Sequence, residues 1–411
     1  MTVRVSKPAF NIREKVSELD KPTGLKGSEL MRSDTSQDAR NLIGVGRKNL
    51  IINGSMQVAQ RGTSDTSTDY FSTVDRWNFT ANGQEENLTR AQESLSSSDT
   101  GPYEKGFRNA WKITNGNQTG GADTGGYVIP QYAIEAQDLA NSGWDYKSAS
   151  SYITLSFWVK SSVAQTFYGF LRTIAGTDQA WSFNYTLSAN TWTKVTKTIP
   201  GLSNGNIDIN DDNTNGMSIF LPIFLGTDRT DSSNVEETWA AYNGSNRTKP
   251  SISGWYTTND ATWHLTGVQL EVGSEATEFE HRSIGEEIEL CRRYYSVFHP
   301  TGQEQVYIES SGVASHSFVN FPVPYGMRTE PSVTLGGTWT GHGIVSGRSI
   351  SAVAVQTIDN GGLNGTTHVG SMGRCSCRVT RDSSGTYTSG QIAHTDGWDD
   401  GVAWLAYDAE I

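Results

Sequence analysis

Two tryptophans near the C-terminal end of the chain have neighbours that could help them bind a sugar. Trp398 is followed by two aspartates, and Trp339 lies two residues before Gly341 and three before His342. An indole can stack on the apolar face of a sugar ring while adjacent polar groups hydrogen-bond its hydroxyls. The alternative is that both indoles are buried at a contact between subunits. The sequence therefore predicts a receptor-binding group: Trp339, His342, Trp398, Asp399 and Asp400.

Two further patterns could hold a metal ion, but neither has the right spacing. Cys375 and Cys377 are separated by one residue, whereas structural zinc sites separate paired cysteines by two or more. The run from Asp208 to Asp212 resembles the start of a calcium loop, yet Asn213 and Ile219 stand where glycine and glutamate are required. We expect thiols on a strand and a solvated turn, and no metal or cofactor. The alternative is a structural calcium ion held by the oxygen-rich run from Asp208 to Asp212.

The sequence contains none of the local motifs of common hydrolases or nucleotide-binding enzymes. Gly-x-Ser-x-Gly, His-Glu-x-x-His and Gly-Lys-Ser/Thr are absent. Glu286, Glu287 and Glu289 lie close together, but a solvated helix face explains them. A pair of catalytic carboxylates assembled by folding would leave no signal in the sequence. The expectation is a protein that is not an enzyme, with a glycan-degrading activity as the alternative.

The elements that position these residues are predicted to be β-strands. The 411 residues include 43 glycines, 12 tryptophans and 16 tyrosines, and only 18% are charged. Many aromatics among small turn-forming residues indicate an all-β chain with short strands. Alternation of apolar and polar residues, as in Ile153-Thr154-Leu155-Ser156-Phe157, is typical of a half-buried strand. The candidate strands are 70–80, 86–94, 107–114, 127–134, 152–160, 166–173, 180–187, 191–199, 217–225 and 262–272.

These ten strands predict a jelly-roll β-sandwich over residues 49–280. A short helix is expected within 281–298, with Ser283 as its N-cap and Glu286 as the capping-box partner. Further strands over 299–411 predict a small C-terminal β domain, a tip that needs partner subunits to complete its core.

The predicted helix carries one narrow apolar stripe, which can pack in two ways. The stripe either packs on the helix's own domain or meets its copies on a threefold axis, and isoleucine at successive positions favours the second. The stripe is formed by Ile284, Ile288, Cys291 and Tyr295.

The first 48 residues differ from the rest of the chain. They are rich in lysine and arginine, poor in apolar residues and interrupted by prolines and glycines. Such a segment has no core of its own. We interpret it as an arm that docks on another protein, the alternative being an arm wrapped on its own chain.

Charge and cysteine content limit the possible partners and compartments. The net charge of −12 argues against nucleic-acid binding and against anionic membranes, and no apolar run is long enough for membrane insertion. Three cysteines cannot form a disulfide framework, and the N-terminus lacks an apolar signal core. The expectation is synthesis in a reducing compartment.

Three stretches carry a family resemblance. They are NLIINGSMQVAQRG at 49–62 with Asp75-Arg76-Trp77; LTGVQLEVG at 265–273 with ATEFEHR at 276–282 and CRRYY at 291–295; and FPVPYGMR at 321–328 with Pro331. In this order they resemble the large β-domain, the following junction and the start of the C-terminal tip in bacteriophage tail-fibre and receptor-binding proteins.

The resemblance implies a jelly-roll domain similar to carbohydrate-binding modules, a linker helix and a trimeric tip. The implied function is attachment of a virion to a host-surface glycan or other receptor. The implied partners are two further copies of the chain and other virion proteins, the latter through residues 1–48, with synthesis in the host bacterial cytoplasm. The alternatives are a glycan-degrading tailspike and a purely structural connector or decoration protein of the virion.

Overall fold

The structure is a computed structural model. It describes residues 49–67, 70–118, 120–298, 306–310, 316–322, 326–329, 331–336, 340–343, 352–356, 374–380, 393–396 and 404–411. The predicted arm over residues 1–48 lies outside the described residues, so its docking role stays a prediction.

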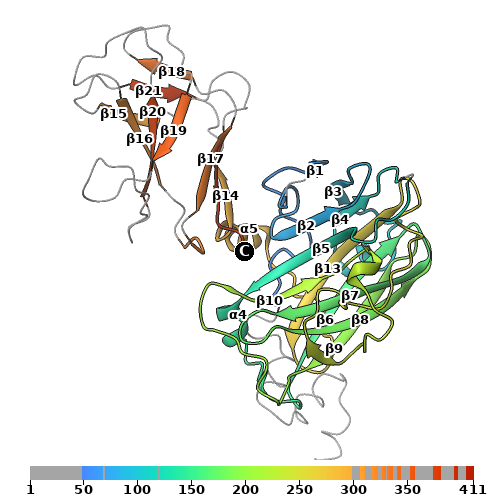
Figure 1. Cartoon of the computed structure of the whole chain (residues 1–411). Helices are drawn as coiled ribbons and strands as arrows, with labels where there is room; N and C mark the ends of the chain where they lie inside the picture. The colour runs from blue at the N-terminus through green and yellow to red at the C-terminus, as the bar shows by residue number, and fades with distance from the viewer. Residues whose placement is uncertain are drawn as a thin grey trace, which may run out of the picture.

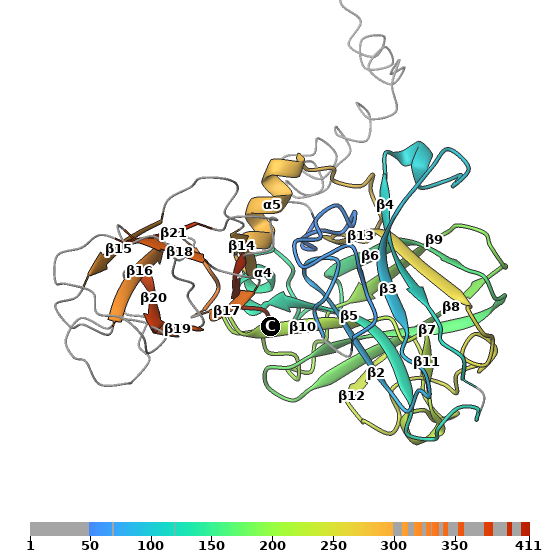
Figure 2. The ribbon, with the colours of Figure 1, turned by 90° about the horizontal axis from the view of Figure 1, so that it is seen from above.

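Two antiparallel sheets form a β-sandwich (Figure 1). The first sheet has the order β1 (Ser64–Asp65), β3 (Thr89–Ser94), β4 (Asn109–Thr114), β13 (Thr262–Val272), β6 (Tyr152–Ser161), β9 (Thr193–Pro200). The second has the order β11 (Phe224–Leu225), β5 (Tyr127–Glu135), β10 (Asn215–Phe220), β7 (Gln165–Thr173), β8 (Gln179–Leu187), β12 (Trp239–Ala241), and β2 (Trp77–Asn82) also pairs with β5. Figure 2 shows the two sheets as two layers.

Alternating side chains build the core between these layers. In β6, Ile153, Leu155 and Phe157 are fully buried, as the two-residue period predicts. Trp111 of β4 lies with its ring centroid 5.9 Å from that of Trp77 of β2, so the two indoles join the first sheet to the second. The prediction of a mostly β chain built around a β-sandwich is confirmed.

Eight of the ten predicted strands have bounds within three residues of the observed strands, and the other two differ more. The strand expected from Tyr70 begins only at Trp77, because Arg76 has a φ of 71° and the amide of Trp77 bonds back to the carbonyl of Val74 in a turn. The run 217–225 is divided into β10 and β11 around Pro222, which has no amide proton to donate. β1, β12 and the short helix α4 (Ala136–Ala140) were not predicted, since none of them spans more than five residues.

The predicted helix is present as α5, Ile284–Arg292. The hydroxyl of Ser283 accepts a hydrogen bond from the amide of Glu286 at 3.2 Å, which confirms the N-cap. In the part of the chain that the structure describes, no helix combines the length and hydrophobicity needed to cross a bilayer.

The predicted trimer seam is wrong for two of its four residues. Tyr295 lies beyond the helix, in strand β14 (Tyr295–Phe298), and is 8% exposed. Cys291 is fully buried in a cluster with Ile52 of the same chain. The chain's own side chains already cover both residues, so they cannot face symmetry copies. Ile284 is 53% exposed and Ile288 is half-buried, and for these two the seam stays a prediction.

The C-terminal part forms two further antiparallel sheets. The smaller has the order β14, β22 (Trp404–Asp408), β17 (Ser332–Gly336). The larger has the order β18 (Thr340–Gly343), β21 (Ala393–Asp396), β15 (Val306–Ser310), β16 (His316–Pro322), β20 (Arg374–Thr380), β19 (Ala352–Gln356). In Figures 1 and 2 the smaller sheet lies between the sandwich and the larger sheet.

Charged side chains attach the last residues of the chain to the sandwich. Arg76, whose side chain is 1% exposed, forms an ion pair with Glu410 and donates to the carbonyl of Ala133 at 2.7 Å. Its guanidinium carbon lies 3.4 Å from the ring centroid of Tyr294. Arg61 contacts the same carboxylate at 3.3 Å and Asp408 at 3.0 Å.

The stretches that carry the family resemblance meet at this junction. Arg61, Arg76 and Tyr294 come from the first two stretches, and Arg328 of the third donates to the carbonyl of Glu410 at 2.8 Å. These residues therefore join the sandwich, the segment after α5 and the chain end. Their role in the structure is to fix the C-terminal sheet, and nothing about them requires a ligand.

Asp75, at the same junction, is expected to make the chain more stable at mildly acidic pH. Burial raises the pKa of its carboxyl from 3.8 to about 6, although the side chain and amide of Gln60 hydrogen-bond to it. The folded chain therefore binds more protons than the unfolded chain between these values. The stabilisation is complete below pH 3.8 and is lost as the pH rises through about 6.

Urea unfolding at pH 7.5 and pH 5 measures this effect. When the pH is lowered from 7.5 to 5, the free energy of unfolding of the wild-type chain should rise by about 1–1.5 kcal/mol more than that of the variant Asp75→Asn. The variant is the control because it carries the same contacts without the titrating proton. Equal changes in both chains would show that Asp75 titrates normally.

Candidate functional site

Of the five residues predicted from sequence to bind a receptor, the structure describes only the backbone of one. Trp339, Trp398, Asp399 and Asp400 lie outside the described residues. The backbone of His342 lies in β18 and pairs with that of His394 in β21, and its side chain lies outside the description. Their receptor-binding role stays a prediction.

The acidic run at 208–212 is engaged in contacts with its own surroundings. Asp208 accepts from the ammonium of Lys147 at 3.2 Å, and Asp212 accepts from the amide of Thr214 at 2.9 Å. Hydrogen bonds from Thr214 lower the pKa of the Asp212 carboxyl. No group of three metal-ligating side chains occurs among the described residues. The contacts fit the solvated turn better than a calcium loop.

The three glutamates of the helix lie in different environments. Glu286 and Glu289 are exposed, whereas Glu287 is buried and accepts a hydrogen bond from the amide of Asn53. Burial raises the pKa of the Glu287 carboxyl, while Asn53 and Arg282 oppose this shift. Glu287 therefore fixes the helix to the start of the sandwich. The solvated helix face predicted for all three glutamates is wrong for this one.

The outer face of the second sheet brings polar and aromatic side chains together. Strands β7 and β8 pair so that Tyr168 lies opposite Asn184, and Phe170 opposite Ser182. Their sequence neighbours, such as Phe183, point into the core, so these four point outward. Phe220 of β10 pairs with Phe170, and the two rings stack with centroids 4.5 Å apart.

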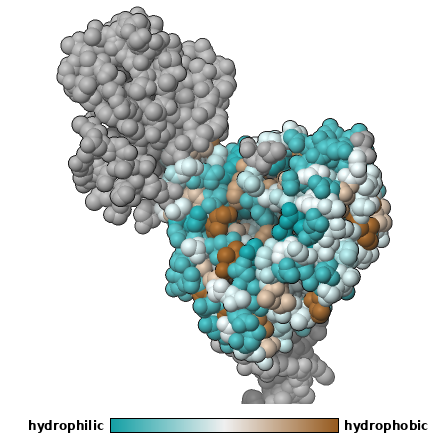
Figure 3. Space-filling model, viewed as in Figure 1, coloured by the Kyte–Doolittle hydropathy of each residue, from teal (hydrophilic) through white to brown (hydrophobic). Residues whose placement is uncertain are grey.

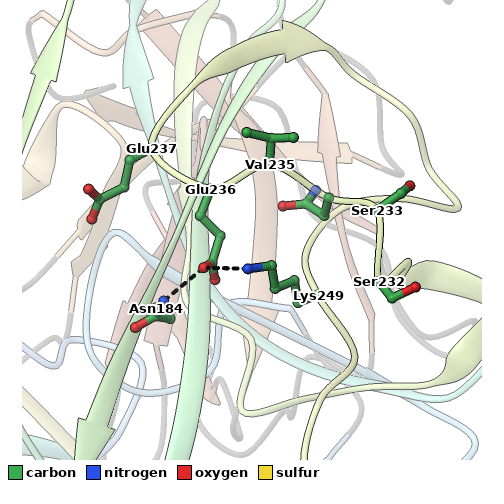
Figure 4. A pocket seen from close by; sticks show the side chains of 8 residues that line it. Asn184, Ser232, Ser233, Val235, Glu236, Glu237 and Lys249 are labelled. Atoms are coloured by element: carbon green, nitrogen blue, oxygen red, sulfur yellow. Dashed lines mark hydrogen bonds and ion pairs between the residues drawn. The ribbon is translucent and has the colours of Figure 1, made fainter.

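An open pocket of about 650 Å³ lies beside this face (Figure 4). Its centre is Glu236, whose Oε2 accepts from Asn184 at 2.9 Å and from Lys249 at 3.2 Å. In Figure 4, Glu237 points away from this group, and its carboxylate accepts from Lys197 at 2.6 Å. The lining residues are Asn184, Ser232, Ser233, Asn234, Val235, Glu236, Glu237 and Lys249.

The pocket combines these polar groups with accessible apolar surface. Val235 is 68% exposed, which is high for a valine. The Glu236 side chain is only 14% exposed, and its Oε1 has no hydrogen-bond partner among the described residues. Burial raises the pKa of the Tyr168 hydroxyl, and the nearby charge of Glu236 adds to the shift. The site therefore places a carboxylate, a side-chain amide and an ammonium group next to exposed apolar atoms.

The loop that builds the pocket is held by polar contacts to the sheet. The hydroxyl of Ser182 donates to Asn234 at 2.7 Å, and the amide of Asn234 donates to Asn246 at 3.0 Å. The surface of the sandwich turned to the viewer in Figure 3 is largely hydrophilic with scattered hydrophobic residues. The exposed groups therefore suit a polar ligand better than a large apolar partner.

The sequence patterns described above do not predict this pocket. Asn184 sits at a polar position of an alternating strand, where a solvated side chain is the ordinary expectation. Glu236 and Lys249 come from an irregular segment with no periodic pattern. The only signal was an unusually long stretch, 226–261, between two strong strands, which is where binding residues often lie.

No family model matches the sequence, and no curated protein matches it. Among solved structures, about half of the chain is similar to three carbohydrate-related proteins. For the family 11 carbohydrate-binding module of the cellulosomal cellulase Lic26A-Cel5E of Clostridium thermocellum, the identity is 14%, the coverage 54% of this chain and 99% of that chain, and the TM-score 0.25.

The second structure is a putative sugar binding protein from Bacteroides thetaiotaomicron VPI-5482, with 12% identity, coverage of 55% and 100%, and a TM-score of 0.29. The third is the N-terminal cellulose-binding domain from Cellulomonas fimi β-1,4-glucanase C, with 14% identity, coverage of 54% and 99%, and a TM-score of 0.25. At these identities and TM-scores the likeness does not establish a function for this chain.

Proposed function

We propose that this chain binds carbohydrate on the outer face of its second sheet, in the pocket centred on Glu236. The observation that carries the proposal is the partly buried Glu236 carboxylate, held by Asn184 and Lys249 beside the exposed Val235. Sugars need planar hydrogen-bonding groups for their hydroxyls and apolar atoms for their C–H faces. A volume of about 650 Å³ suits a short oligosaccharide.

The proposed role is binding without catalysis. Glycoside hydrolysis needs two carboxylates that face each other across the scissile bond. Glu236 and Glu237 engage different cations, Lys249 and Lys197, and do not face each other across the pocket. A tailspike-like enzyme remains the alternative, and shortened polysaccharide chains after incubation with the protein would support it.

Calorimetric titration of the full chain with a panel of oligosaccharides tests the binding site. Asn184→Ala and Glu236→Gln should each weaken binding about tenfold, the effect of losing one or two hydrogen bonds to a charged group. Glu104→Gln, which changes an exposed glutamate of the short 3-10 helix at 103–105, is the matched control and should leave affinity unchanged. Unchanged affinity in the pocket variants would place the site elsewhere.

We further propose that the chain is a virion protein, a tail fibre or adhesin with a jelly-roll sandwich and a trimeric tip. The support is the ordered set of sequence motifs at 49–77, 265–295 and 321–331. Immunogold labelling of purified phage particles with an antibody to this chain tests the location. Light scattering of the purified protein tests for a mass of three chains, and a monomeric mass would contradict the trimer.

A further inference from the structure

Three arginines and two tyrosines form a ledge next to the pocket. The guanidinium carbon of Arg172 lies 3.8 Å from the ring centroid of Tyr242, and that of Arg247 lies 5.9 Å from the same centroid. Arg229 lies 4.5 Å from the ring centroid of Tyr127. All five side chains are partly exposed, so a ligand can reach them. We call these five residues the arginine ledge.

The ledge carries more positive charge than its neighbours neutralise. Only Arg172 forms an ion pair, with Asp178, among the contacts that the structure describes. Arg229 donates to the carbonyl of Gly125 at 2.9 Å, and Arg247 to that of Gly244 at 3.1 Å. Neither carbonyl neutralises a guanidinium, which leaves an excess of about two positive charges.

This excess is unusual for the chain as a whole. The protein has 44 acidic and 32 basic residues, so a cationic group is not the average surface. Burial lowers the pKa of Arg247, and the nearby charges of Arg229 and Arg172 add to this shift while Tyr242 opposes it. Asp228, the carboxylate next in sequence to Arg229, accepts instead from the hydroxyl of Thr124 at 3.0 Å. The guanidinium groups repel one another, and a bound anion would offset this repulsion.

The ledge and the pocket share one segment and one sheet face. Arg247 precedes the pocket residue Lys249 by two positions, and its amide donates to the carbonyl of Arg229 at 3.0 Å. The Phe170 ring lies 6.5 Å from that of Tyr242 and is stacked on Phe220. The ledge therefore begins two residues from the pocket lining, which allows one extended ligand to contact both.

We propose that the arginine ledge binds a carboxylate-bearing sugar, such as a uronic acid, within the glycan that occupies the pocket. This inference rests on the proposed carbohydrate binding. A guanidinium presents paired N–H groups that match a carboxylate, and the adjacent tyrosine rings offer a stacking surface for the sugar ring. Sulfated sugars share the negative charge but not the planar carboxylate.

Binding to acidic polysaccharides and to their carboxyl-reduced forms tests the proposal. The probes are polygalacturonate, alginate and hyaluronan oligosaccharides, each beside its carboxyl-reduced product, with a sulfated neutral glycan as a further arm. The full chain should bind at least one acidic probe more than tenfold tighter than its reduced form. The affinity should also fall as sodium chloride is raised.

The variants Arg247→Gln and Arg229→Gln should each lose at least tenfold affinity for the acidic probe. Arg247→Lys, which keeps the charge but not the paired donors, should lose less affinity for the acidic probe than Arg247→Gln does. Arg108→Gln is the matched control, because Arg108 is also stacked on a tyrosine, at 4.1 Å from the ring centroid of Tyr103, and directly precedes β4 of the opposite sheet. Circular dichroism and thermal unfolding confirm that each variant is folded.

The outcomes separate this inference from the proposed function. Equal binding of acidic and reduced probes, weakened by Glu236→Gln, would keep the carbohydrate site and overturn the acidic-sugar proposal. Preference for the sulfated probe would also overturn it. Absence of binding to every probe would contradict both proposals for these glycans.

Discussion

Replacing Glu410 with glutamine is expected to lower the free energy of unfolding by about 3–5 kcal/mol, the effect of leaving a buried charge without its partner. Arg76 is 1% exposed and has Glu410 as its ion-pair partner in the described structure. Its remaining contacts are the carbonyl of Ala133 and the rings of Tyr132 and Tyr294, none of which carries a full negative charge.

Urea unfolding at pH 7.5 measures this loss, with Asp408→Asn as the matched control. Asp408 contacts Arg61 in the same network but is 38% exposed. Asp408→Asn should therefore lower the free energy of unfolding by less than about 1 kcal/mol. The pair of substitutions Arg76→Met and Glu410→Met should destabilise the chain less than the sum of the two single changes. Equal effects of Glu410→Gln and Asp408→Asn would mean that the chain end is not buried against the sandwich.

Replacing Trp111 with alanine is expected to cost about 3–5 kcal/mol, the range for truncating a fully buried aromatic residue. Trp111 is 1% exposed, contacts Trp77 and Phe79 across the sandwich, and donates to the hydroxyl of Thr73 at 3.1 Å. The substitution leaves a large cavity between the two sheets, and the hydroxyl of Thr73 loses its hydrogen-bond donor.

Thermal unfolding of Trp111→Ala beside Tyr70→Ala provides the comparison. Tyr70 is 62% exposed, and truncating it should change the free energy of unfolding by less than about 0.5 kcal/mol. A small effect at Trp111 would show that the two sheets do not depend on this contact. The folded fraction of the variant should still bind glycan, because the proposed pocket lies on the opposite side of the second sheet.

The strands of the sandwich could be predicted because their signal is local. The period of two in Ile153-Leu155-Phe157 and in Trp181-Phe183-Tyr185 marks the apolar face that packs in the core, although Thr154 and Ser156 on the other face of β6 are also buried. The N-cap of α5 was predictable for the same reason, since Ser283 and Glu286 are three residues apart.

The direction in which the α5 stripe packs could not be predicted from its spacing. An apolar stripe indicates that one face of the helix is buried, but it does not indicate which residues cover that face. In the structure Cys291 packs on Ile52, a residue 239 positions away, which no periodic pattern reveals. The same limit explains Arg76 and Glu410, where the ion pair depends on a contact across 334 positions.

The candidate site was missed for a related reason. Asn184, Glu236 and Lys249 are unremarkable polar residues until β8 and the segment after β11 place them together. The sequence pointed to tryptophans instead, since an indole beside carboxylates is a recognisable local pattern. Whether the tip residues Trp339 and Trp398 add a second receptor contact is a separate prediction.

Hydrogen–deuterium exchange of the full chain, with and without a saturating glycan from the binding panel, tests the central claim most directly. We expect slower exchange in β7, in β8 and in residues 230–249, with β3, β4 and β9 of the first sheet unchanged. Protection confined to the first sheet, or to residues 299–411 alone, would contradict a carbohydrate site on the outer face of the second sheet.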